Sequence, residues 1–282
     1  MIPAEFDYHA PTSVEAAQHL LASSNDAKAL AGGQSLMPLL RMRLATPELI
    51  VDLSKIDELR GIRDAGDAIV IGAMTPHATV MTDPLVAEHA ALLAKAATLI
   101  GDPQVRHVGT FGGSMAHADP ASDLPACAMA MGAEFEIAGS EGRRSVAAAD
   151  FFQDIFTTAI GDDEILTEVR IPKHTGWGAH YEKFVRTAQQ WPIVAVAATV
   201  RVVGGSIAEA HVALANMGST PIRSQAVEQA LVGVAPEDGA VRAAVADIAA
   251  GTNPPTDING DDAYRRHLAP ILARRAVLAA AG

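Results

Sequence analysis

Cysteine is almost absent from this sequence, which has one, Cys127, in 282 residues. A single thiol excludes an intramolecular disulfide. It also excludes an iron–sulfur cluster held by this chain alone, because such a cluster takes about four cysteine ligands. Cys127 lies in the apolar run 124–131. A thiol in such surroundings usually packs as a small hydrophobic side chain, so we expect Cys127 to be buried and structural.

Basic patches and long apolar runs are also missing. The formal net charge is −12, and the arginine pairs 143–144, 265–266 and 274–275 are scattered along the chain. A nucleic-acid partner is not expected, because proteins that bind nucleic acid usually carry a basic face. No stretch approaches the roughly 20 apolar residues that cross a bilayer, and the N-terminus lacks the basic and apolar segments of a signal peptide. The sequence therefore predicts a soluble cytoplasmic protein that is not transmembrane.

Aromatic residues make up 4% of the sequence and hydrophobic residues 49%, so the core is expected to be aliphatic. Hydrophobic periodicity predicts the elements of the first two-thirds of the chain. Thr12 and Glu15 have the spacing of a capping box that opens the first helix. The expected strands are 27–31, 49–53, 68–73, 133–138 and 165–171. The expected helices are 36–44, 85–100 and 122–131.

The last third has a different order of elements. Strands are expected over 193–203 and 207–215, with Gly204 and Gly205 between them as a hairpin signal. Helices are expected over 224–232, 238–250 and 261–281, with a loop over 251–260. Strands followed by helices, rather than alternating with them, predict an α+β fold.

A first glycine segment follows the strand expected over 27–31. It comprises Ala31, Gly32, Gly33, Gln34 and Ser35, and a helix is expected from Leu36. Glycine permits positive φ and lets the backbone approach a ligand closely, and successive N–H groups in such a turn form a concave anion site. The segment lacks the spacing of a Rossmann fingerprint, and no Gly-Lys-Ser/Thr follows it. Taken alone, the segment is a weak signal and is better explained as a plain strand-to-helix turn.

A second glycine segment repeats these ingredients. It comprises Thr110, Phe111, Gly112, Gly113 and Ser114. Two such segments in one chain can hold the two ends of one pyrophosphate. Neither segment brings a lysine or an obvious metal-binding carboxylate. Nucleotide hydrolysis is therefore disfavoured, and a permanently held diphosphate cofactor is favoured.

Polar residues follow the second glycine segment, and three interpretations of them are open. His117 and Asp119 could ligate a metal ion, but no third or fourth ligand is obvious nearby. Ser114, His117 and Asp123 could form a hydrolase triad, but no nucleophile-elbow pattern surrounds the serine. The favoured interpretation is that these groups bond to the sugar and phosphate of the cofactor. We therefore predict no metal site in this chain.

Four stretches together carry a specific resemblance to a known family. They are AGGQSL, GDPQVRHVGTFGGSMAHADPASDLP, YEKFVRTAQQWPIVAVA and YRRHLAPILARRAV, in this order over essentially the whole chain. With them the sequence resembles the FAD-binding medium subunits of molybdenum hydroxylases, the xanthine dehydrogenase family. Within that family it is most similar to the aerobic carbon monoxide dehydrogenase type.

The resemblance implies the fold and its division. The implied fold is an α+β, VAO/PCMH-type FAD-binding domain of two subdomains, residues 1–55 and 56–175. A carbon monoxide dehydrogenase flavoprotein C-terminal domain, a small antiparallel sheet with helices, would occupy residues 176–282. The FAD pyrophosphate would lie between the two glycine segments.

The resemblance also implies cofactor contacts outside the glycine segments. The further positions are Leu36, His117, Asp123, Leu166, Lys183 and Trp191. In the family pattern Asp123 would bond a hydroxyl of the cofactor's sugar or ribityl chain, and Lys183 would contact the flavin. Leu166 would pack on the cofactor, and Trp191 would lie beside the isoalloxazine.

Two of these positions depart from the carbon monoxide dehydrogenase pattern. Trp191 stands where a tyrosine is usual, and Gln34 stands where some members have histidine. Both differences bear on the substrate rather than on the FAD site. A core aromatic is the other interpretation of Trp191, although Pro192 directly after it favours an exposed turn.

The implied activity is electron transfer within a larger oxidoreductase. A large partner subunit would hold a molybdopterin-type molybdenum cofactor, and a small one would hold two [2Fe–2S] clusters, in a dimer of heterotrimers. FAD would pass the electrons to an external acceptor such as a quinone, which would place the complex against the inner face of the membrane. No catalytic acid or base is needed here. A self-contained FAD oxidase or NAD(P)H reductase, and a scaffold that has lost its flavin, are the alternatives.

Overall fold

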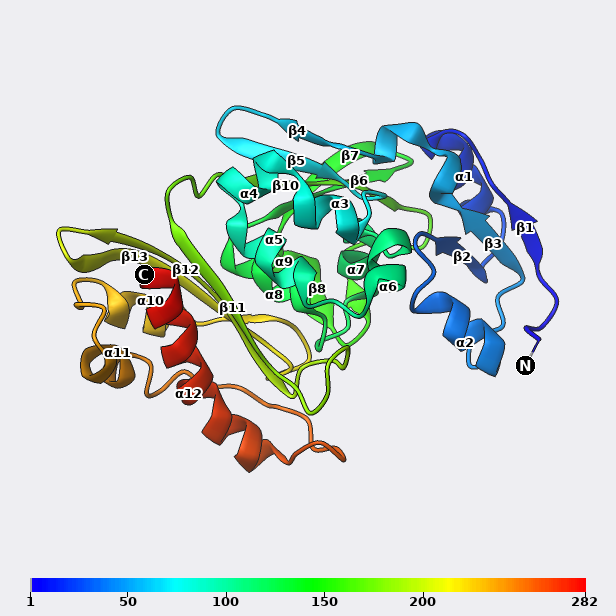
Figure 1. The fold of residues 1–282 in the computed structure, drawn as a ribbon. Helices are drawn as coiled ribbons and strands as arrows, with labels where there is room; N and C mark the ends of the chain where they lie inside the picture. The colour runs from blue at the N-terminus through cyan, green and yellow to red at the C-terminus, as the bar shows by residue number, and fades with distance from the viewer. Residues whose placement is uncertain (1) are drawn as a thin grey trace.

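The computed structural model describes residues 2–282, which form three successive units, each built around its own β-sheet (Figure 1). The first unit holds a parallel sheet of order β1-β3-β2. Its elements are β1 (Asp7–His9), α1 (Val14–Ala22), β2 (Ala27–Leu30), α2 (Leu36–Met42) and β3 (Leu49–Asp52). Two short 3-10 helices, η1 (Leu53–Lys55) and η2 (Asp57–Leu59), lead into the second unit.

The second unit holds a five-stranded antiparallel sheet of order β4-β5-β10-β6-β7. Its strands are β4 (Ile62–Asp64), β5 (Ala68–Gly72), β6 (Glu134–Gly139), β7 (Gly142–Ala147) and β10 (Ile165–Pro172). Its helices are α3 (His77–Thr82), α4 (Pro84–His89), α5 (Ala91–Thr98), α6 (Pro103–Val108), α7 (Phe111–His117), α8 (Asp123–Ala130) and α9 (Ala148–Phe151). A small hairpin of β8 (Phe152–Asp154) and β9 (Thr157–Thr158) follows α9.

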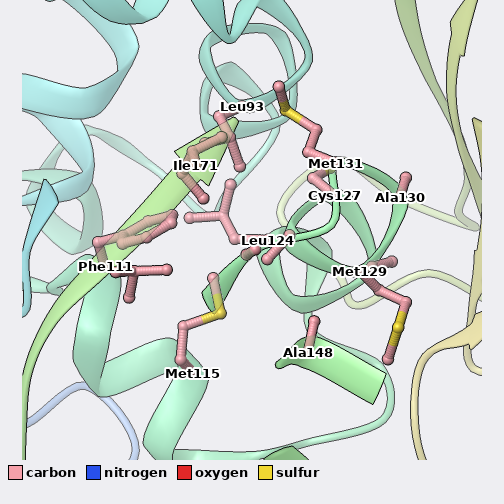
Figure 2. Packing of buried hydrophobic residues seen from close by; sticks show 14 of the residues in the cluster. Leu93, Phe111, Met115, Leu124, Cys127, Met129, Ala130, Met131, Ala148 and Ile171 are labelled. Atoms are coloured by element: carbon pink, nitrogen blue, oxygen red, sulfur yellow. The ribbon is translucent and has the colours of Figure 1, made fainter. Parts of the chain in front are cut away.

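The core of the second unit is centred on α8, whose eight residues are all buried. Figure 2 shows Leu93 of α5, Leu124 of α8 and Ile171 of β10 close together, with Phe111 of α7 beside them. Cys127 is part of this core, as expected, and burial raises the pKa of its thiol. A helix that is apolar on every side needs neighbours on every side, and α8 obtains some of them from the third unit.

The third unit holds an antiparallel sheet of order β11-β12-β13-β14. Its elements are β11 (Gly178–Phe184), β12 (Val194–Val203), β13 (Ser206–Ala215), β14 (Ile222–Arg223), α10 (Gln225–Leu231), α11 (Asp238–Ala244) and α12 (Asp262–Ala281). One face of the sheet packs on α5 and α8, and α12 covers the other face (Figure 1). The strand β11 therefore lies between α5 of the second unit and α12.

The strand β12 is buried on both faces, and its residues differ between them. Ala195 and Ala197 point toward the core that contains α8, whereas Val194, Val196 and Val200 point toward α12. Successive strand side chains face opposite sides, and alanine on one side lets the sheet approach α8 closely. The α+β prediction is confirmed, and so is the hairpin at residues 204–205.

Several predicted boundaries were wrong. The N-cap of α1 is Ser13 and not Thr12, since the Ser13 hydroxyl accepts the Ala16 N–H at 3.2 Å. The helix expected over 85–100 is divided into α4 and α5 at Ala90, which adopts φ −141° and ψ 43°. The helix expected over 238–250 ends at Ala244. The strands β1, β4, β7, β8, β9, β11 and β14 were not predicted.

The arginines near the C-terminus pack within the chain. Arg265 is fully buried, pairs with Asp257 at 2.8 Å and donates to the carbonyl of Ile193. Arg266 donates to the carbonyls of Ala249 and Thr252. None of the helices within residues 2–282 combines the length and the apolar composition that crossing a bilayer needs.

Candidate functional site

A cavity of about 580 Å³ has walls from all three units. Fifteen of the sixteen predicted cofactor contacts line it: Ala31, Gly32, Gly33, Gln34, Ser35, Leu36, Thr110, Gly112, Gly113, Ser114, His117, Asp123, Leu166, Lys183 and Trp191. The exception is Phe111, whose side chain is fully buried in the core beside α8 (Figure 2). The volume lies in the ordinary range for small-molecule sites.

The first glycine segment connects β2 to α2 and presents free donors. Gly33 has φ +69°, a conformation that glycine adopts without strain. Within residues 2–282, the backbone N–H groups of residues 32–35 have no hydrogen-bond acceptor. Consecutive unpaired N–H groups on the wall of a cavity form an anion-binding cradle, which agrees with the interpretation of this segment as a phosphate site.

The second glycine segment is the start of α7 rather than a loop, and its donors are occupied. The N–H of Gly112 donates to the Ala73 carbonyl at 2.8 Å, and that of Phe111 donates to the Thr75 carbonyl at 2.8 Å. The N–H of Gly113 donates to the Thr110 hydroxyl at 3.1 Å. This segment therefore offers the cavity a surface without side chains and the Ser114 hydroxyl, instead of a second cradle of N–H groups.

The two glycine segments touch directly. A Cβ at Gly32 would lie 2.4 Å from the carbonyl oxygen of Val108 and 2.6 Å from the Cα of Gly109. A Cβ at Gly112 would lie 2.4 Å from that of Ala73. Both positions exclude a larger residue: at Gly32 the backbone of the first unit packs on that of the second, and at Gly112 the start of α7 packs on Ala73 within the second unit.

A buried ionic network joins the second and third units at the cavity wall. The Asp123 carboxylate accepts a hydrogen bond from the Tyr181 hydroxyl and another from the Lys183 ammonium, both at 2.8 Å. Lys183 also donates to the Leu99 carbonyl at 3.0 Å. The side chains of Asp123 and Lys183 are each 7% exposed. Tyr181 and Lys183 belong to β11, so this strand pairs across the unit boundary with the N-terminus of α8.

The network perturbs the ionisation of its members. Burial raises the pKa of Asp123, and Lys183 and Tyr181 act in the opposite direction by stabilising its charged form. Burial and the neighbouring carboxylate raise the pKa of Tyr181 well above its ordinary value, so the tyrosine is a constant donor. The Lys183 ammonium has three N–H groups. Within residues 2–282 it donates to two acceptors, the Leu99 carbonyl and the Asp123 carboxylate.

The metal and hydrolase interpretations find no support in this geometry. The described residues contain no group of three or more histidine, cysteine or acidic side chains that could hold a metal ion. Asp123 pairs with Lys183 and Tyr181, so it does not orient His117. The His117 ring instead lies against Phe156, with 4.9 Å between ring centroids, and burial lowers its pKa.

Trp191 lies at the rim of the cavity and is 65% exposed. The interpretation of this residue as part of an exposed turn is therefore confirmed, and its interpretation as a core aromatic was wrong. Leu166 lies within the cavity wall and is buried. Sequence reasoning missed several other lining residues, among them Met74, His77, Ile100, Val105 and Gln189. Val105 and Gln189 lie within the stretches that carry the resemblance but were not assigned to the site, and Met74, His77 and Ile100 lie outside those stretches, so only the fold brings them to it.

Residues 4–174 match the family model described as the FAD binding domain in molybdopterin dehydrogenase. Residues 179–280 match the CO dehydrogenase flavoprotein C-terminal domain. The chain belongs to the FAD-binding subunits of the molybdenum hydroxylases. It is 41% identical to the carbon monoxide dehydrogenase medium chain of Hydrogenophaga pseudoflava, over 99% of this chain and 98% of that protein.

Chains of solved oxidoreductase structures agree with this assignment. Carbon monoxide dehydrogenase from Hydrogenophaga pseudoflava, in a form lacking the Mo-pyranopterin moiety, has a chain that superposes with a TM-score of 0.96 at 42% identity. That alignment covers 99% of this chain and 98% of the other. Quinoline 2-oxidoreductase from Pseudomonas putida 86 superposes with a TM-score of 0.95 at 34% identity, covering 100% and 98%.

The residues of the cavity fit the FAD of this family. The free N–H groups of residues 32–35 suit a diphosphate, and the glycine surface of the second segment lets it approach the backbone. Apolar walls such as Leu166 and Ile100 suit flat aromatic rings. The chain is thus an oxidoreductase subunit whose cofactor is FAD.

Proposed function

We propose that this chain is the electron-transfer subunit of a heterotrimeric molybdenum hydroxylase. It receives electrons from the [2Fe–2S] clusters of a partner and passes them through FAD to an external acceptor. The observation that carries the proposal is the cavity shared by three units, whose wall includes both the first glycine segment, with the free N–H groups of residues 32–35, and the glycines of the second segment. Bound FAD supplies the capacity to accept and release electrons, which no side chain offers.

The residues of this chain bind and orient that cofactor. The N–H groups of residues 32–35 hold the pyrophosphate, and the hydroxyls of Ser35 and Ser114 add donors on either side. Asp123 would accept from a hydroxyl of the cofactor's sugar or ribityl chain, and Lys183 would contact the flavin. Leu166 would pack on the ring system, and Trp191 would lie beside it. We further propose contacts from the rest of the predicted set, Ala31, Gln34, Leu36, Thr110, Phe111 (through its backbone) and His117.

We extend the proposal to the assembly. A large subunit holds the molybdopterin-type molybdenum cofactor and a small subunit holds two [2Fe–2S] clusters, in a dimer of heterotrimers. The single cysteine, Cys127, is fully buried, which supports placing the clusters in another chain. A quinone is the proposed acceptor, and the complex would lie in the cytoplasm against the inner face of the membrane.

We propose carbon monoxide as the substrate of the complex. The similarity to carbon monoxide dehydrogenase medium chains over 99% of this chain supports this choice. The quinoline 2-oxidoreductase chain has nearly the same backbone, so the substrate must be selected in the large subunit. We also propose 1–55, 56–175 and 176–282 as the domain boundaries, because each of the three larger sheets falls within one of these ranges.

The test is to purify the chain with its partner subunits and record its visible spectrum. We expect a flavin band that bleaches under carbon monoxide without oxygen and returns when a quinone is added. Absence of a flavin band from the purified, oxidised complex would contradict FAD binding. Rapid bleaching of the isolated chain by NADH would instead support the alternative of a self-contained reductase. Bleaching of the complex by an aldehyde or an N-heterocycle, and not by carbon monoxide, would correct the substrate.

Trp191 provides a further prediction, because the sequence has only two tryptophans. Trp177 is stacked on His174, with 4.6 Å between ring centroids, whereas Trp191 lines the cavity. We expect FAD binding to quench the protein fluorescence, and Trp191→Phe to remove most of that quenching because the indole nearest the flavin is gone. The measurement is a fluorescence titration of the FAD-free chain. Trp177→Phe is the matched control and should keep the quenching; the reverse pattern would contradict the placement of Trp191.

A further inference from the structure

His77 is a cavity-lining residue that no sequence motif indicated. It is the first residue of α3, and its backbone N–H donates to the Gly109 carbonyl at 2.9 Å. The residue is 6% exposed, yet it contributes to the cavity wall. An imidazole with this little exposure normally hydrogen-bonds to the protein around it.

Neither ring nitrogen of His77 has such a partner. The Nδ1 atom is enclosed and unpaired, and within residues 2–282 no hydrogen bond is made by Nε2. Burial lowers the pKa of His77 to about 4, so the ring is neutral near pH 7 and carries one N–H. A proton on Nδ1 would leave an enclosed donor without an acceptor, which is costly. The proton therefore belongs on Nε2.

Because Gly109 has no side chain, the Nε2 edge of the His77 ring is left uncovered. A Cβ on Gly109 would lie 2.9 Å from Cδ2 of His77 and 3.2 Å from its Nε2, so any other residue would cover this edge. Gly109 also lines the cavity, and Gly32 packs against its Cα. The Nε2 edge of His77 thus lies beside Gly109, the residue against which Gly32 of the first glycine segment packs.

We propose that His77 is an additional cofactor-binding residue, which donates a hydrogen bond from Nε2 to an oxygen of the FAD diphosphate. This rests on the proposed function, since it takes FAD to be the occupant of the cavity. The acceptor is assigned to the diphosphate because His77 lies against Gly109, and Gly109 in turn packs against Gly32 of the first glycine segment. A neutral donor buried next to an anion provides a hydrogen bond to a charged group, which is stronger than a neutral one.

The test uses the full-length chain freed of FAD and three probes, namely FAD, ADP and riboflavin. The variant His77→Phe keeps the ring volume and removes the donor, and His77→Gln keeps an N–H. We expect His77→Phe to weaken FAD and ADP about tenfold or more and to leave riboflavin, which has no diphosphate, unchanged. His77→Gln should retain most of the ADP affinity. Calorimetric titration gives the dissociation constants.

The matched control is His174→Phe. His174 also has an unpaired Nδ1 and a pKa lowered to about 4, but it stacks on Trp177 away from the cavity. The His174→Phe variant should bind FAD, ADP and riboflavin with the affinities of the unchanged chain. Unaltered ADP binding by His77→Phe, or equal losses for ADP and riboflavin, would overturn the assignment of His77. If the unchanged chain binds neither FAD nor ADP, the proposed function fails as well.

Discussion

Replacing Gly32 by alanine is expected to abolish the retention of FAD. The added Cβ would lie 2.4 Å from the Val108 carbonyl oxygen and 2.9 Å from the Thr110 nitrogen. Both are backbone atoms that cannot rotate away, so the two glycine segments must separate. Such overpacking typically costs about 1–3 kcal/mol in stability. We expect FAD affinity to fall at least about 100-fold, because the cradle moves away from the opposite wall.

The measurement is a titration of FAD into the FAD-free Gly32→Ala chain, together with its thermal unfolding. Gly239→Ala is the control, since Gly239 lies in the helix α11 with no atom within 4 Å of its would-be Cβ. Alanine there should leave FAD binding unchanged and should stabilise the helix by about 0.5–1 kcal/mol. Tight FAD binding by Gly32→Ala would show that the two segments do not form one site.

The position of the first glycine segment could be predicted because its signal is local. A short strand, two glycines and a helix start follow one another within ten residues, and the chain needs nothing distant to form that turn. The second glycine segment has similar residues, a glycine pair followed by a serine, but a different structure, because it forms the start of α7. Its N–H groups at Phe111 and Gly112 donate to the carbonyls of Thr75 and Ala73, which lie nearly forty residues earlier, so only the tertiary fold determines that these donors are occupied.

The third unit was predicted in outline for a similar reason. The hairpin at residues 204–205 is signalled by two adjacent glycines. The role of the alanines in β12 could not be predicted. A strand buried on both faces lacks the alternation of apolar and polar residues that tells which side chains face the core. Ala195 and Ala197 have a neighbour in α8 only because the third sheet packs on the second unit. The division between α4 and α5 at Ala90 could not be predicted either, since no glycine or proline marks it.

The resemblance placed Asp123 and Lys183 near the flavin but did not pair them. They are 60 residues apart in the chain, on a helix and a strand of different units. Their meeting depends on how β11 lies against α8, which no local pattern encodes. The pairing changes the expected behaviour of both residues, because each is now the partner that makes burial of the other tolerable.

Replacing Lys183 by methionine is therefore expected to destabilise the fold as well as weaken FAD binding. Methionine keeps the length of the side chain and removes the charge, which leaves the Asp123 carboxylate buried with Tyr181 as its remaining side-chain donor. Removing one partner of a buried ion pair costs about 3–5 kcal/mol. The measurement is urea unfolding of the FAD-free chain at pH 7. Arg242→Met, which breaks the exposed Asp238–Arg242 pair, should cost at most about 0.5 kcal/mol.

The pH dependence of that loss distinguishes an unpaired charge from lost packing. Burial already raises the pKa of Asp123 above its ordinary value of 3.8, and removing Lys183 raises it further. A carboxyl whose pKa is higher in the folded state binds its proton more tightly there, so its contribution to stability is present at low pH and lost as pH rises through the folded pKa. Lys183→Met should thus approach the stability of the unchanged chain toward pH 4 and fall below it toward pH 7. Adding Asp123→Asn removes the charge, and the double variant should be more stable at pH 7 than Lys183→Met alone. A deficit that is independent of pH and of Asp123 would mean that Lys183 acts by packing alone.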